Sequence, residues 1–162
     1  MSVLAVLTDK LSKLLKYITF VMLAVMVCII TAQVFFRYVV GTSLSWSEEM
    51  ARFLFVWIVL LGAANGVKEN YHVVITAVTN RLPEKAAKIV NIIDILLIMV
   101  VALCMTVYGY QMAMKAAGHL SAAMRISTLW QYIPVPISGV AIILFSLENL
   151  VEAIKDLKGG KE

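Results

Sequence analysis

Two long apolar segments flank the sequence Arg37-Tyr-Val-Val-Gly-Thr-Ser-Leu-Ser-Trp-Ser-Glu-Glu-Met-Ala-Arg52. Within it, Ser45-x-x-Glu48 matches the capping box, in which a Ser hydroxyl and a Glu carboxylate satisfy backbone N–H groups at a helix start. The pattern predicts a helix that begins here, with Glu48 and Glu49 in its first turn, where the helix dipole favours negative charge. The chain is therefore expected to turn between two helices at this stretch.

Charged side chains gather on both sides of this turn. Arg52 follows Glu48 by four residues and Glu49 by three, so both carboxylates can reach its guanidinium on one helix face. Arg37 ends the preceding apolar segment nearby. We predict a self-neutralising cluster of Arg37, Glu48, Glu49 and Arg52 at the edge of a bilayer, where unpaired charge is costly. The alternative is that these are ordinary solvated charges that flank the helices.

The composition indicates a membrane protein. Of the 162 residues, 62% are hydrophobic and 15% are charged, whereas soluble domains have about 45–50% apolar and about 25% charged residues. Because a helical span needs roughly 20 residues, we predict an all-α integral membrane protein whose single membrane domain, 1–162, has four transmembrane helices. The spans are expected at about residues 17–40, 47–67, 87–111 and 130–150. Basic residues are scattered at the span ends, which argues against a nucleic-acid partner.

Shorter segments are expected at the membrane surface. Val3 to Leu15 places leucines at helical spacing with lysines between them, as in an amphipathic interfacial helix. The weakly apolar Val73 to Val78 is too short to span and lies in a polar stretch. Pro83 fits the first turn of the third span, and Pro134 and Pro136 are expected to bend the entry to the fourth.

The orientation follows from the positive-inside rule. Ten of the 14 Lys and Arg residues lie in the N-terminal tail, the 68–88 loop and the C-terminal tail, and four lie on the opposite side. This asymmetry predicts that both termini are cytoplasmic, an N-in/C-in topology. Trp46 and five other aromatic residues fall at the outer ends of spans, as expected for an interfacial belt.

Two features within the spans are candidates for packing or transport. Gly62 and Gly66 have the G-x-x-x-G spacing that permits close approach of a neighbouring helix. Asp94 is the one acid well inside an apolar run, and an intramembrane carboxylate is a functional candidate. One hypothesis is therefore a homo-oligomeric four-helix carrier that uses Asp94. The alternative places Asp94 near the headgroups or in a hydrogen bond to a neighbouring helix.

The sequence gives no support for catalysis. His72 and His119 lie in loops on opposite sides of the membrane in this topology, so one chain cannot supply a pair of axial haem ligands. A membrane redox subunit would need a bound chromophore, which a visible absorption spectrum would reveal. Cys28 and Cys104 lie in apolar stretches without a C-x-x-C partner and are interpreted as packing residues. We therefore expect neither a cofactor nor a metal in this chain.

A family resemblance adds to this interpretation. Four motifs follow Arg37 in order: Ser45-Trp-Ser-Glu-Glu49, Arg52-Phe-Leu-Phe-Val-Trp57, Leu61-Gly-Ala-Ala64 and His72-Val-Val-Ile75. This succession resembles the DctQ-like small membrane subunit of tripartite ATP-independent periplasmic (TRAP) transporters. Leu82-Pro83 and Pro134-x-Pro136 agree more loosely. At the position after the last motif the family often has an acid, and this chain has Thr76.

The resemblance implies a secondary transporter of a bacterial inner membrane. A periplasmic substrate-binding protein would capture an organic acid, such as sialic acid or a C4-dicarboxylate. A large multi-span membrane subunit, a separate polypeptide, would move it together with sodium bound at that subunit. The small subunit would hold the large one in the lipid bilayer and help present the docking surface. The candidate structural or interface residues are Arg37, Trp46, Glu48, Glu49, Arg52, Gly62, Gly66 and His72.

Overall fold

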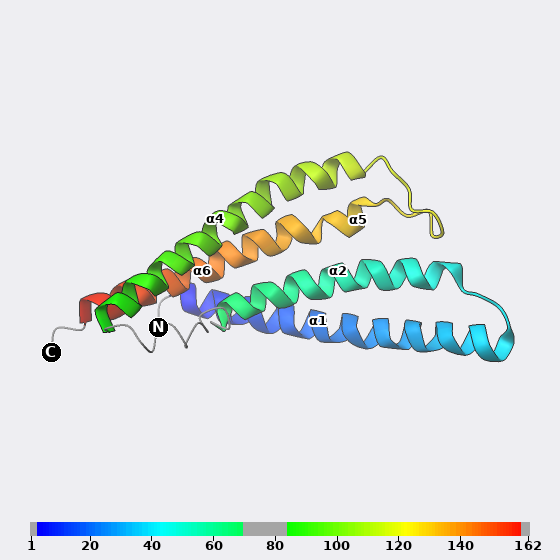
Figure 1. The fold of residues 1–162 in the computed structure, drawn as a ribbon, viewed down its shortest axis with the longest axis horizontal. Coiled ribbons are helices and arrows are strands. Elements are labelled where there is room, and N and C mark those ends of the chain that lie inside the picture. Colours follow the sequence, from blue (N-terminus) through cyan, green and yellow to red (C-terminus); the bar gives the residue numbers. More distant parts are fainter. Residues whose placement is uncertain (1–2, 70–83, 160–162) are drawn as a thin grey trace.

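The computed structural model describes residues 3–69 and 84–159 (Figure 1). These residues form helices and the segments that connect them. The elements are α1 (Val3–Phe35), which continues as the π-helical turn η1 (Phe36–Val40), α2 (Ser45–Lys68), α4 (Glu84–Ala116), the short α5 (Leu129–Tyr132) and α6 (Pro134–Gly159). Within the described residues, four helices are long and apolar enough to cross a membrane. The predicted all-α fold with four spans is confirmed.

The helices form two antiparallel hairpins, α1–α2 and α4–α6 (Figure 1). α6 packs against α4 and α2, and α2 packs in turn against α1. α1 begins and α6 ends toward the same end of the bundle, which we call the inner end (Figure 1). Toward the opposite, outer end the hairpins diverge, and the connection from α4 to α5 reaches toward the start of α2 (Figure 1).

The N-terminal segment differs from its prediction. Val3 to Leu15 is not a separate surface helix but the first part of α1, continuous with the span. Its buried side chains are Thr8, Ser12 and Leu15, whereas Leu7 and Leu14 are exposed. The polar stripe faces the bundle because its hydroxyls find hydrogen-bond partners on α2 and α6. Leu7 and Leu14 are left toward the surroundings, as lipid contact would favour.

The fourth span, which was predicted to bend at its prolines, is divided there into α5 and α6. α5 ends at Tyr132, and α6 begins with Pro134 after the single residue Ile133. The Ile133 N–H still donates to the Leu129 carbonyl at 2.9 Å, but Pro134 has no N–H to continue the ladder. Pro83 and the segment Val73–Val78 lie outside the described residues.

α4 and α6 lie close together at two glycines. A Cβ on Gly139 would lie 2.5 Å from Thr106 Oγ1 and 2.9 Å from the Ala102 carbonyl oxygen. A Cβ on Gly109 would lie 2.7 Å from Val135 Cγ1. By contrast, no atom lies within 4 Å of a Cβ built on Gly62, so this chain does not use the predicted close approach at that residue.

We expect the Gly139→Ala variant to lose about 1–3 kcal/mol of unfolding free energy, the usual cost of overpacking a filled site. The added methyl would meet the backbone of α4, which cannot rotate away as a side chain can. Gly62→Ala is the matched control, and it should be neutral or slightly stabilising because Ala favours helix by up to about 1 kcal/mol. Unfolding of both variants in mixed micelles, followed by circular dichroism, checks this. Equal losses would contradict it.

Candidate partner surfaces at the two ends of the bundle

At the outer end, Glu49 holds the connection between α4 and α5. Its carboxylate accepts hydrogen bonds from three consecutive backbone N–H groups, those of Ala122 at 3.1 Å, Ala123 at 3.0 Å and Met124 at 2.8 Å. Hydrogen bonds to an ionised acceptor are roughly twice as strong as neutral ones. The next residue, Arg125, has a φ of 53°, a conformation that turns the chain back after these donors. We call residues 117–128 the outer loop.

The predicted four-residue charge cluster does not form. Glu48 and Arg52 pair at 3.3 Å, but both side chains are exposed. Glu49 instead accepts hydrogen bonds from three consecutive backbone N–H groups of the outer loop. Arg37 pairs with neither glutamate, and its guanidinium lies 5.8 Å from the centroid of the Tyr38 ring. The i,i+4 spacing correctly predicted the Glu48–Arg52 pair, whereas Glu49 and Arg37 do not join it.

The predicted capping box is also wrong, although the helix begins where the motif stands. Leu44 is the N-cap residue, and no side chain caps the helix. The Ser47 hydroxyl donates instead to the Leu44 carbonyl at 2.6 Å. Glu48 lies in the first turn, as predicted. The negative charge favoured at this helix start thus remains, without the reciprocal hydrogen bonds.

Further hydrogen bonds order the outer end of the bundle. The Trp57 indole N–H donates to the Trp130 carbonyl at 2.9 Å and so joins α2 to α5. The Thr128 hydroxyl donates to the Ala116 carbonyl at 2.8 Å, and the Ser127 hydroxyl to the Ala117 carbonyl at 2.9 Å. These contacts give the outer end one ordered surface that spans both hairpins.

At the inner end, a buried ion pair joins three helices. Lys68 Nζ lies 2.6 Å from Glu148 Oε2 and 2.9 Å from Asp9 Oδ1, and only 13% and 7% of the Lys68 and Glu148 side chains are exposed. The Thr8 hydroxyl donates to the same Glu148 oxygen at 2.5 Å. Glu148 therefore has two donors, as a buried carboxylate requires. We call Thr8, Asp9, Lys68 and Glu148 the inner polar cluster.

Three more side-chain contacts surround the inner polar cluster. The Ser12 hydroxyl donates to the Asn65 side-chain oxygen at 2.9 Å, and the Asn149 amide donates to the Val67 carbonyl at 2.8 Å, near the end of α2. Lys16 and Glu69 form an ion pair that is more exposed. We had not singled out any of these residues from the sequence. The available signal was the polar pair Thr8 and Ser12, four residues apart in an otherwise leucine-rich helix.

The other sequence-derived candidates are dispersed. Trp46 is exposed at the start of α2, and Gly66 is partly exposed near its end. Asp94 is partly exposed on α4. Because Gly139 lies against Ala102 and Thr106, the antiparallel pairing places Asp94 opposite the turn of α6 that contains Glu148. His72 and Thr76 lie outside the described residues.

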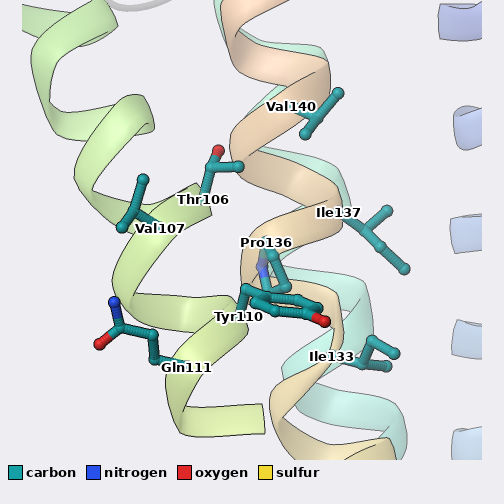
Figure 2. A pocket seen from close by; sticks show the side chains of 8 residues that line it. All are labelled: Thr106, Val107, Tyr110, Gln111, Ile133, Pro136, Ile137 and Val140. Carbon is teal, nitrogen blue, oxygen red and sulfur yellow. The ribbon is translucent and has the colours of Figure 1, made fainter. Parts of the chain in front are cut away.

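An apolar groove of about 850 Å³ lies between α4 and α6 near the outer end (Figure 2). Figure 2 shows the Tyr110 ring beside Pro136, whereas the Gln111 amide points away from α6. Ile137 and Val140 complete the α6 wall. No basic side chain lines this groove, so it lacks the cationic groups that a carboxylate ligand would need.

Comparison with known proteins assigns the family. The family model described as "Tripartite ATP-independent periplasmic transporters, DctQ component" matches residues 26–156. The chain belongs to this DctQ family. The matched residues contain Glu49, the outer loop, Lys68 and Glu148, whereas Thr8 and Asp9 precede them. This DctQ component is therefore a multi-pass membrane subunit of a transporter and not an enzyme.

Relatives of the DctQ component support the assignment. The chain is 32% identical over 145 residues to the sialic acid TRAP transporter small permease protein SiaQ of Vibrio cholerae, covering 89% of this chain and 83% of that protein. It is 32% identical over 115 residues to the sialic acid TRAP transporter permease protein SiaT of Haemophilus influenzae, covering 71% of this chain and 19% of that protein. It is 31% identical over 64 residues to the C4-dicarboxylate TRAP transporter small permease protein DctQ of Vibrio cholerae, covering 40% of this chain and 28% of that protein.

Proposed function

We propose that this chain is the membrane scaffold of a sodium-coupled TRAP transporter for an organic acid such as sialic acid or a C4-dicarboxylate. A large multi-span membrane subunit is its lateral partner and binds both sodium and substrate. The observation that carries this proposal is the DctQ family match over 26–156. The name of the similar SiaQ protein supports sialic acid as the first substrate to test.

The uncovered helix surfaces support a large partner in the membrane. We compare an apolar segment of 18 residues in each of three spans. No residue of this segment is buried within the chain in the α1 span, 11% are buried in α4, and 50% are buried in the α6 span. Since TM helices associate through close packing and interhelical hydrogen bonds, a subunit that packs on α1, α2 or α4 would use surfaces that this chain does not itself cover.

The outer end supports a docking role. The outer loop is held to α2 by Glu49, and the following helix α5 is held to α2 by Trp57, so this end presents a preformed surface. Preformed surfaces bind with a smaller loss of conformational entropy. We propose that this surface contributes to docking of the periplasmic substrate-binding protein. Both termini then lie in the cytoplasm and the inner polar cluster lies at the cytoplasmic end of the bundle.

The rival hypothesis of a carrier that acts alone has less support. Such a carrier is expected to hold its substrate near the bilayer midplane. Asp94 lies opposite the Glu148 turn of α6, toward the inner end. The apolar groove of Figure 2 contains no charged lining residue.

Uptake in the native host tests the proposed function. Cells that lack this gene should lose sodium-dependent uptake of radiolabelled sialic acid or C4-dicarboxylate and regain it when the gene is restored. A sodium ionophore should abolish the restored uptake because it removes the driving gradient. If uptake of both acids is unchanged in cells without the gene, the proposed substrates are rejected. If the ionophore leaves the restored uptake unchanged, the sodium coupling is rejected.

A further inference from the structure

The α2 and α4 helices border a second apolar groove, which we call the α2/α4 groove. It has a volume of about 310 Å³ and is lined by Ala63 and Val67 of α2, Leu97, Val101 and Met105 of α4, and Ile142 of α6. Its α2 wall is low at Ala63, which is a small residue. Small residues of this kind let another helix backbone approach closely.

A polar group without a partner lies in line with this groove. Asp94, Val101 and Met105 are spaced by seven and four residues, so they share one face of α4. Among the residues that the structure describes, the Asp94 carboxylate makes no hydrogen bond or ion pair. One turn before it, Asn91 Oδ1 is buried and likewise has no hydrogen-bond partner. The Asp94 carboxylate and Asn91 Oδ1 both accept hydrogen bonds, and a donor from a neighbouring helix would satisfy them.

Asp94 also restricts what can fill the groove. Unpaired acids in membrane segments are costly and are generally paired with a basic group, another polar side chain or backbone. A lipid tail in the groove would cover the apolar wall but leave the carboxylate unpaired. A lipid phosphate beside Asp94 would be repelled, because like charges at close range disfavour each other. The occupant that suits both parts is a helix with a basic or amide side chain.

We propose that one transmembrane helix of the large membrane subunit lies in the α2/α4 groove and donates a hydrogen bond from a Lys, Arg or amide side chain to Asp94. A rotation of the partly exposed Asn91 side chain turns its oxygen toward the same donor. The apolar lining supplies contact area, and Asp94 fixes the register of the two helices. This inference rests on the proposed function, since it requires the large subunit.

Photo-crosslinking in the intact complex tests the groove without changing Asp94. A photoreactive amino acid is placed at Val101 in the groove or, as a matched control, at Leu103 on the opposite face of α4. The two side chains are equally exposed, at 59% and 57%, and Leu103 lines a different groove with Leu96 and Ile143. We expect irradiation of membranes to link position 101 to the large subunit and position 103 to lipid.

A second set of variants tests the donor to Asp94. Asp94→Leu should reduce the large subunit retained by the tagged chain about tenfold, because a hydrogen bond to a charged group is worth about 1.5 kcal/mol or more. Asp94→Glu should restore most of it. Glu152→Leu is the control, because Glu152 is an exposed acid of α6 that also lies toward the inner end of the bundle.

The outcomes separate this inference from the proposed function. Cross-links to the large subunit from position 103 alone, from both positions equally, or only to lipid from position 101 would overturn the groove assignment. Equal retention by the Asp94→Leu and Glu152→Leu variants would overturn the role of Asp94. In each of these cases the large subunit is still recovered and the proposed function stands. Its complete absence from the purified wild-type chain would reject both.

Discussion

Replacing Lys68 with Met is expected to lower the free energy of unfolding by about 3–5 kcal/mol. Removing one member of a buried ion pair leaves the other charged and without compensation, and this is the usual size of that effect. Glu148, of which 7% of the side chain is exposed, would retain only the Thr8 hydroxyl as a donor. Because the Lys68–Glu148 pair joins α2 to α6, the two hairpins should separate at the inner end.

Lys16→Met is the matched control for this prediction. Lys16 is also a lysine paired with a glutamate between α1 and α2, but 51% of its side chain is exposed. Exposed pairs contribute about 0–1 kcal/mol. Titration of each variant with SDS in mixed micelles, followed by circular dichroism, measures the difference. A Lys68→Met loss no larger than that of Lys16→Met would show that the inner polar cluster does not stabilise the bundle.

Replacing Glu49 with Ala is expected to reduce transport while the four-helix bundle remains assembled. The backbone N–H groups of residues 122–124 would lose their acceptor, and the outer loop would no longer be held against α2. Ordering one residue again on docking costs about 1–2 kcal/mol of backbone entropy. Two such residues would weaken docking of the binding protein at least about tenfold.

Glu48→Ala is the control, since Glu48 is adjacent and carries the same charge but pairs only with the exposed Arg52. Uptake by reconstituted complex, measured against the concentration of binding protein, separates the two variants. Glu49→Ala should need a higher concentration for half-maximal uptake, and Glu48→Ala should behave like the wild type. Identical curves for all three proteins would exclude the outer loop as a docking element.

The number and order of the spans could be predicted from the sequence because each depends on local hydrophobicity. The run from Tyr17 to Phe36 is long enough to cross a bilayer on its own. The start of α2 was likewise visible in the polar stretch around Ser45. These features are decided by a few neighbouring residues, and the structure confirms them.

The side-chain contacts at the two ends could not be predicted in this way, because they join residues far apart in the chain. The partners of Glu49 lie 73 to 75 residues later, and those of Lys68 lie on both α1 and α6. At short range Arg52 was the evident partner for Glu49. In the structure Glu49 binds three backbone N–H groups instead of Arg52, and only the folded chain brings these groups to Glu49.

The most direct test of the central claim is purification of the tagged chain from its native host in a mild detergent, with identification and quantification of the membrane proteins that accompany it. The DctQ assignment predicts a much larger multi-span protein, in about equal amount to this chain. Recovery of the chain alone, as a dimer or higher homo-oligomer that transports an organic acid after reconstitution, would contradict the scaffold role.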